Sequence, residues 1–369
     1  MLKEELLKRN LPKLKNRDEM IKILLENEYG VLPKIEYNLT VSEPEIIQNK
    51  ASCLHSAYHS KVNMTIETKN GKHTFRVGRL LYNDNEKHPL IVFVNFRESV
   101  PDYYYPIEEI ANRGFSVLSF CYKNVTSDDS NFNDGLAKVL LANGQENDNT
   151  AGKIMIWAYA CMRVLDYAET LSGIDLGNVG VLGHSRLGKT ALVTAMLDTR
   201  FKYAFSNDSG CSGASLSRGN SGLLVYGSQR NYDDPRIYGY GETVADILYK
   251  FPYWFCKNYG KYTKNNYPDE FDQHYLLSSI APRFTYVASG SKDYWADPNS
   301  EFLNCVASSE AYEKLGLKGL ICDDKSPNIG DRFLEGRIGY HLREGIHFLS
   351  NYDWKNFMDY IDLHKNEKV

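Results

Sequence analysis

A serine stands between two glycines where an apolar run meets a helical pattern. Residues 178–182 (Asn-Val-Gly-Val-Leu) are typical of a short buried strand, and apolar residues recur at helical spacing from residue 187 to residue 196. Ser185 therefore falls at a strand-to-helix turn, which Gly183 and Gly188 free the backbone to make. Such a turn lifts the hydroxyl above the sheet edge, beside backbone N–H groups that can hold an oxyanion. Either Ser185 is a nucleophile, or it only caps an ordinary turn.

Strand and helix patterns alternate on both sides of this turn. Continuous apolar runs predict strands covered on both faces, and alternating polar and apolar residues before them predict an antiparallel hairpin. We expect hairpin strands at 61–68 and 74–82, later strands at 90–95, 115–120, 203–207, 283–288 and 337–343, and helices near 107–112 and 152–171. This order predicts an α/β fold: a doubly wound three-layer αβα sandwich with a mostly parallel sheet and an antiparallel N-terminal hairpin.

The chain is long enough to bury one large core, and no repeat divides it. We expect a single domain over residues 1–369, with an N-terminal helical extension at 1–33 that ends where glycine and proline stop the pattern. Residues 209–281 do not follow the strand–helix alternation. Long irregular inserts are often functional, so we expect this one to lie over the active site, with a solvated surface loop as the alternative.

Composition excludes several classes of partner. A net charge of -4 and a pI near 6.2 give no electrostatic footprint for nucleic acid or an anionic membrane. The charged start and the lack of a long apolar run predict a cytoplasmic protein. The 7 cysteines lack metal-type pairing and fit reduced thiols in the core. No pattern calls for a cofactor.

A nucleophilic serine needs a base, and the base needs an acid to orient it. His347 follows the last predicted strand and is the candidate base. Asp293 lies in the turn after the preceding strand, and Asp208 ends the strand that follows the Ser185 helix. The carboxyl ends of parallel strands meet at one edge of a sheet, so either carboxylate could reach His347. The sequence leaves both open, with a turn-capping role as the alternative for Asp208.

Other histidines fit the chemistry less well. His341 falls inside a predicted strand, where a packed side chain is expected, and His184 is expected to point away from the turn and pack. His55 and His59 are four residues apart but lack a third ligand nearby, so we expect no metal site.

Several segments together resemble the glucuronoyl esterase family of carbohydrate esterases, whose fold is that of the α/β-hydrolases. Bacterial members carry a Gly-His-Ser-Arg-x-Gly-Lys turn, as residues 183–189 do. Further matching blocks follow in family order over roughly residues 85 to 360: 207–214 (Asn-Asp-Ser-Gly-Cys-Ser-Gly-Ala), 241–244 (Gly-Glu-Thr-Val), 251–255 (Phe-Pro-Tyr-Trp-Phe), 295–298 (Trp-Ala-Asp-Pro) and 345–347 (Gly-Ile-His).

The resemblance implies a role for each matching position. Ser185 would be the nucleophile and His347 the base, and the acid would be Asp208 or Asp293, since family members use either position. Arg186 would help to form the oxyanion hole. Contacts to the hydroxyls and ring of the sugar are implied for Lys189, Glu242 and Trp295.

Asp208 and the residues after 218 depart from the family pattern. Many relatives have glutamate where this chain has Asp208, and the shorter side chain favours Asp293. The stretch from Arg218 to Gly241 is longer than the pattern leads us to expect, which weakens the assignment of Glu242.

The resemblance and the residues together predict a serine carboxylic-ester hydrolase that acts on a small carbohydrate ester or oligosaccharide, most readily a glucuronoyl ester. Two alternatives stay open. One is an esterase of acetylated sugars or acetyl xylan built on the same residues. The other is a catalytically silent carbohydrate-binding relative, for which the short Asp208 side chain argues. Oligomeric state and the alcohol partner are not fixed by the sequence.

Overall fold

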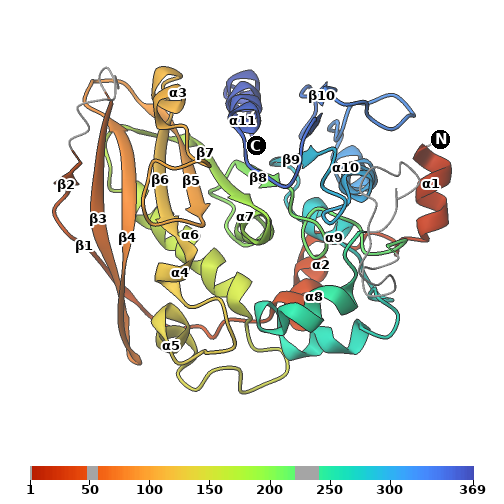
Figure 1. The fold of residues 1–369 in the computed structure, drawn as a ribbon, viewed down its shortest axis with the longest axis horizontal. Helices are drawn as coiled ribbons and strands as arrows, with labels where there is room; N and C mark the ends of the chain where they lie inside the picture. Colours follow the sequence, from red (N-terminus) through yellow and green to blue (C-terminus); the bar gives the residue numbers. More distant parts are fainter. Residues whose placement is uncertain (1, 48–56, 221–240) are drawn as a thin grey trace.

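The structure, a computed structural model, describes residues 2–47, 57–220 and 241–369. Its helices alternate with strands along most of the chain (Figure 1). They are α1 (Leu2–Arg9), α2 (Arg17–Leu24), α3 (Ile107–Asn112), α4 (Tyr122–Val125), α5 (Gly135–Leu141), α6 (Lys153–Ala168), α7 (Arg186–Leu197), α8 (Val244–Lys250), α9 (His274–Ser278), α10 (Pro298–Glu313) and α11 (Asn351–His364), with a π-helical turn η1 (Leu25–Tyr29) and 3-10 helices η3 (Pro252–Trp254) and η4 (Lys257–Tyr262).

One mixed sheet runs through the described residues. Its strands are β1 (Asn38–Val41), β2 (Glu45–Ile46), β3 (Ala57–Thr68), β4 (Gly71–Tyr82), β5 (His88–Asn95), β6 (Ser116–Cys121), β7 (Ile174–His184), β8 (Tyr203–Asn207), β9 (Phe284–Gly290), β10 (Arg332–Phe333) and β11 (Ile338–Arg343). The spatial order is β1-β3-β4-β6-β5-β7-β8-β9-β11-β10, with β2 paired to β3. The strands from β6 to β11 in this order are parallel, and antiparallel strands flank them on both sides.

Helices cover both faces of the parallel strands. Alternate residues of β5 point to opposite sides: Val92 packs in the core that contains α6 and α7, and Phe93 packs in the core that contains α3 and α11. Figure 1 shows α3 and α11 together at the top of the view, across the sheet from α6. Because both faces are covered, these strands are buried along almost their whole length and mostly apolar, and the predicted three-layer αβα sandwich is confirmed.

The predicted elements match the observed ones closely where the apolar pattern is strong. The hairpin becomes the longer pair β3 and β4, and the expected helix at 152–171 is α6. Two strands of the antiparallel edge, β1 and β2, and the long helices α10 and α11 were not anticipated. Within the described residues, no helix has both the length and the apolar character that spanning a membrane requires.

The segment expected as an insert contributes no strand between β8 and β9 in its described part. It holds α8, η3, η4 and α9, while the Gly- and Tyr-rich stretch largely lies outside the described residues, at 221–240. At the N-terminus, α1 packs against α10, and both lie on the right of Figure 1. The division into one domain with an extension and an insert stays a prediction.

Gly183 is required for the turn between β7 and α7. A Cβ atom at this position would stand 1.9 Å from the Leu187 carbonyl oxygen, which belongs to the first turn of α7. The close approach of strand and helix therefore leaves no room for a side chain, and this contact sets where Ser185 emerges.

Replacing Gly183 with alanine should lower the free energy of unfolding by about 1–3 kcal/mol, because the helix must shift away from the strand. Urea unfolding measures the effect. Gly260→Ala is the matched control: its Cβ would have nothing within 4 Å, so a change within about 0.5 kcal/mol is expected. Equal stabilities of the two variants would contradict this packing argument.

Candidate active site

Ser185 stands at the junction of β7 and α7, as the sequence predicted. Its backbone adopts φ 58 and ψ -129, a conformation that a residue with a side chain rarely takes. The Ser185 N–H donates to the Asn207 carbonyl at 2.8 Å, which ties the turn to the end of β8. The strained serine is half-buried at the start of a helix, where N–H groups lack intrahelical partners.

His347 and Asp293 meet across two neighbouring turns. Nδ1 of His347 lies 2.6 Å from Oδ2 of Asp293, whose side chain is 3% exposed against 40% for the histidine. The turns themselves are joined, because the Lys292 N–H donates to the Gly345 carbonyl at 2.8 Å. A partly exposed imidazole held by a buried carboxylate is the arrangement that a general base requires.

Asp208, the other carboxylate that the sequence left open, is used differently. Its side chain accepts hydrogen bonds from Gly290 N at 2.7 Å, Phe348 N at 3.2 Å and Arg343 Nη2 at 2.9 Å. It therefore fastens the turns after β9 and β11 rather than the glycine-rich turn behind it. Burial and the nearby charge of Asp293 raise the pKa of Asp208, while Arg343 acts against them.

The pKa of His347 is set by opposing effects. Burial lowers it, but the hydrogen bond and negative charge of Asp293, together with the charge of Asp208, outweigh burial and raise the pKa above its ordinary value. Both carboxylates thus favour the protonated imidazole. This is the form that a base reaches after it has taken a proton.

His184 links Ser185 to this acid–base pair. Its ring centroid is 4.5 Å from that of His347, and its Nδ1 lies 2.6 Å from Asn207 Oδ1. The side chain is buried, as expected, but the expectation that it points away from the site is wrong, because it packs against the candidate base. Burial and the neighbouring His347 lower the pKa of His184 to about 3, so its ring stays neutral.

No hydrogen bond joins the Ser185 hydroxyl to His347 among the described residues. The ring of His184, the residue before Ser185, contacts that of His347, so the base lies next to the turn that carries the serine. In proteins without bound substrate such catalytic hydrogen bonds are often long. The structure thus brings Ser185, Asp293 and His347 to the carboxyl edge of the parallel strands β7, β9 and β11.

Arg186, predicted for the oxyanion hole, lies among aromatic rings. Its guanidinium carbon is 4.5 Å from the centroid of the Trp254 ring and 5.2 Å from that of Phe251. Nη1 forms an ion pair with Asp128, and the buried Nε has no hydrogen-bond partner in the described structure. A fixed cation with an unused donor next to Ser185 can stabilise developing negative charge.

The three residues predicted to contact the sugar, Lys189, Glu242 and Trp295, each already contact other protein groups. Lys189 is buried, and its ammonium donates to the carbonyls of Ser209 and Cys211. An ammonium has three donors, so one is left. The Glu242 N–H donates to the Trp295 carbonyl at 3.1 Å, and Lys250 Nζ lies 4.0 Å from the Trp295 ring centroid.

Glu242 is a buried acid beside this lysine. Burial raises the pKa of its carboxyl to about 7, although the charge of Lys189 acts against the rise. Sugar contacts of the three residues stay a prediction.

Other histidines lie as follows. His341 is fully buried on β11 and binds Asp353 at 2.8 Å and the Tyr286 hydroxyl at 2.9 Å, so the expected packing role is confirmed. His59 is buried on β3, and His55 lies outside the described residues.

Within the described part of the chain, the residues of the acid–base cluster are close enough together to hold a metal ion. One ligand atom each of Asp208, Asp293 and His347 lies within 4.8 Å of the others. These atoms already share hydrogen bonds with one another or with Arg343 and backbone N–H groups. The donor set therefore fits acid–base chemistry better than ion binding.

Two charged residues of this region, Asp128 and Arg343, were not predicted from the sequence. Asp128 lies in the loop after α4, the short helix that follows β6, and Arg343 is the last residue of β11. Arg343 lies at the carboxyl end of a parallel strand and Asp128 a few residues beyond one, where side chains converge on a site, and this position was the signal that could have found them.

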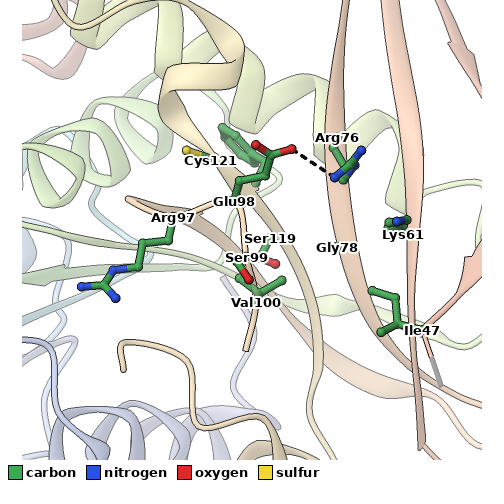
Figure 2. Close-up of a pocket in the computed structure, with 11 residues that line it drawn as sticks. Ile47, Lys61, Arg76, Gly78, Arg97, Glu98, Ser99, Val100, Ser119 and Cys121 are labelled. Atoms are coloured by element: carbon green, nitrogen blue, oxygen red, sulfur yellow. Dashed lines mark hydrogen bonds and ion pairs between the residues drawn. The ribbon is translucent and has the colours of Figure 1, made fainter. Parts of the chain in front are cut away.

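A cavity of about 180 Å³ lies apart from Ser185, against β4 and β6 (Figure 2). Its cations Lys61 and Arg76 are paired with Glu45 at 2.8 Å and Glu98 at 3.0 Å. Figure 2 shows Arg97 pointing away from both. These ion pairs leave Lys61 and Arg76 little charge to attract an anionic ligand.

Comparison with known sequences gives consistent matches. The family model described as "Glucuronyl esterase, fungi" matches residues 64–316, more than half of the chain. Carbohydrate esterase MZ0003, from an unknown prokaryotic organism, is 38% identical over 58% of this chain and 44% of its own length. A 4-O-methyl-glucuronoyl methylesterase of Hypocrea jecorina is 28% identical over 56% of this chain and 42% of its own length. The matches thus span less than half the length of these curated relatives.

Solved structures agree over almost the whole chain. A promiscuous CE15 esterase from a marine bacterial metagenome superimposes with a TM-score of 0.79 at 27% identity, covering 94% of this chain and 91% of that one. A glucuronoyl esterase from Solibacter usitatus gives a TM-score of 0.76 at 25% identity, with coverage of 95% and 92%. By its sequence blocks, its αβα sandwich and the match of the family model, the chain belongs to the glucuronoyl esterase family.

Proposed function

We propose that this protein hydrolyses uronate esters of carbohydrates through a covalent acyl-enzyme. The observation that carries the proposal is the 2.6 Å contact between His347 and Asp293 next to the strained Ser185 turn. Relatives named as glucuronoyl methylesterases support the choice of a uronate ester.

The mechanism follows from the positions of these groups. Ser185 Oγ attacks the ester carbonyl while His347 Nε2 takes its proton, and Asp293 holds Nδ1–H so that Nε2 is the free acceptor. The oxyanion that forms receives hydrogen bonds from the start of α7 and from Arg186. The C–O bond to the alcohol then breaks, and His347 returns the proton to the leaving oxygen. Water, deprotonated by His347, attacks the acyl-enzyme and releases the uronic acid and Ser185.

Lys189 and Glu242 supply the contacts that favour a uronate acyl group. Lys189 lies one helical turn after Ser185 and retains one N–H for a sugar hydroxyl. Glu242, near this ammonium, adds carboxylate oxygens that can accept from hydroxyl groups. An acetyl group is too small to use them.

Ser185→Ala should abolish turnover of methyl glucuronate, with a loss of at least about 10⁴-fold in kcat, since the acyl-enzyme cannot form. Sugar binding should persist in calorimetry. Ser99→Ala, an exposed serine of the loop after β5, is the control and should keep full activity. Turnover by Ser185→Ala would refute the mechanism, and faster cleavage of acetylated sugars than of methyl glucuronate by wild type would refute the proposed substrate.

Comparison of Asp293→Asn with Asp208→Asn should show which of the two aspartates supports His347. Asp293→Asn removes the charge that orients and supports His347, so kcat should fall about 10²–10⁴-fold. Asp208→Asn should cost less than about tenfold in kcat, because its contacts are with Arg343 and backbone N–H groups. A larger kcat loss in Asp208→Asn than in Asp293→Asn would reverse the assignment.

The pH dependence of kcat/KM should report His347. The imidazole must be neutral to accept the serine proton, and its pKa is raised, so activity should fall as pH drops through a value above the ordinary histidine pKa of about 6.5. In Asp293→Asn the residual activity should persist to lower pH, because burial then acts with less opposition. A profile that moves to higher pH in this variant would contradict the cause given for the shift.

A further inference from the structure

Asp128 connects Arg186 to the elements around it. Its side chain is 8% exposed and forms the ion pair with Arg186 Nη1. The same carboxylate accepts hydrogen bonds from the Tyr122 hydroxyl at 2.9 Å and from Trp254 Nε1 at 2.7 Å. Its main-chain carbonyl accepts from the Tyr253 hydroxyl at 2.9 Å. One residue thus joins α4, η3 and the first turn of α7.

The guanidinium of Arg186 has few other restraints. Besides Asp128, it lies over the rings of Trp254, Phe251 and Phe96, whose faces attract the cation but accept no directional hydrogen bond from it. Hydrogen bonds are directional, whereas ring contacts are broad. The direction in which Nε and the remaining N–H groups point is therefore set by Asp128.

We propose that Asp128 is a positioning residue that orients the Arg186 guanidinium toward the oxyanion formed at the Ser185 adduct. The inference rests on the proposed ester hydrolysis and extends it to a residue that touches neither the substrate nor the reacting atoms. Nη1 is held by the carboxylate, and the buried, unpartnered Nε remains available as a donor.

The charges are consistent with Nη1 binding Asp128 while Nε serves the oxyanion. A guanidinium cannot lose its proton, so beside the apolar rings of Trp254 and Phe251 it needs a counter-charge. Asp128 supplies that charge before the substrate arrives, on the side of Nη1. The donors therefore need no rearrangement when negative charge develops, which is the condition under which such donors are effective.

The test is a double-variant cycle measured as kcat and KM on methyl glucuronate. Asp128→Asn keeps the side-chain shape and removes the charge, and kcat should fall about 10–100-fold with KM changed less than about threefold, because the oxyanion exists only after attack. In an Arg186→Ala background the same change should cost nothing further, since there is no guanidinium to orient. In that background Asp128→Asn should instead stabilise the protein, because it removes a buried carboxylate that has lost its ion-pair partner.

Two further variants keep the test decisive. Asp129→Asn makes the same charge change at the exposed neighbouring residue and should stay within about threefold of wild type. Tyr122→Phe removes one hydrogen bond to Asp128 while leaving the ion pair in place, so it replaces Asp128→Asn if that variant does not fold. Its smaller kcat loss should likewise vanish in the Arg186→Ala background.

Each outcome has a distinct meaning. Equal losses from the Asp128 change in both backgrounds, or a loss confined to KM, would overturn the positioning role while leaving the proposed function intact. A wild-type protein that cleaves no ester would overturn the proposed function, and the inference with it. Loss of kcat in Asp128→Asn that disappears without Arg186 supports both.

Discussion

The candidate site depends on Arg343, a buried arginine at the carboxyl end of β11. Its guanidinium contacts Asp208 at 2.9 Å and Asp353 at 3.0 Å, and it also donates to the carbonyls of Ile346 and Phe348. These carbonyls flank His347 in the chain. The arginine therefore ties the loop that carries the candidate base to β8 on one side and to α11 on the other. Leaving a buried partner of such a cluster unpaired costs about 3–5 kcal/mol, so the cluster holds the loop in one arrangement.

The contacts of Arg343 also explain why Asp208 and Asp293 bind different partners. Asp208 is committed to Arg343 and to two backbone N–H groups. Among the described residues, the Asp293 side chain binds the Ala296 N–H at 3.2 Å and His347, and so is available to the imidazole. Two carboxylates this close repel each other, and a nearby arginine lowers that cost. The shorter side chain of aspartate at position 208 is thus no obstacle to an acid–base pair, because His347 takes its support from the other acid.

Features that depend on neighbouring residues in the sequence could be predicted, whereas features that depend on contacts between distant residues could not. Fully buried parallel strands such as β8 begin with a run of apolar residues, so their bounds could be predicted nearly to the residue. The Ser185 turn follows from glycines whose role is local. The partner of His347 could not be chosen, since Asp208 and Asp293 both follow strand ends and only the position of Arg343 separates them. The orientation of His184 was mispredicted because it depends on Asn207, a neighbour across the sheet.

Arg186 and Lys189, the two cations to which the proposed mechanism gives a role, are each held by other groups of the protein. Arg186 is paired with Asp128, and Lys189 donates to two carbonyls and feels the charge of Glu242. Burial lowers the pKa of Lys189, and Glu242 opposes that effect, so the acid helps to keep the ammonium charged. Each cation therefore bears its desolvation cost during folding rather than during the reaction. In the mechanism we propose, an entering substrate would meet donors already fixed in direction, so that the binding energy of its sugar is left to position the ester carbonyl over Ser185.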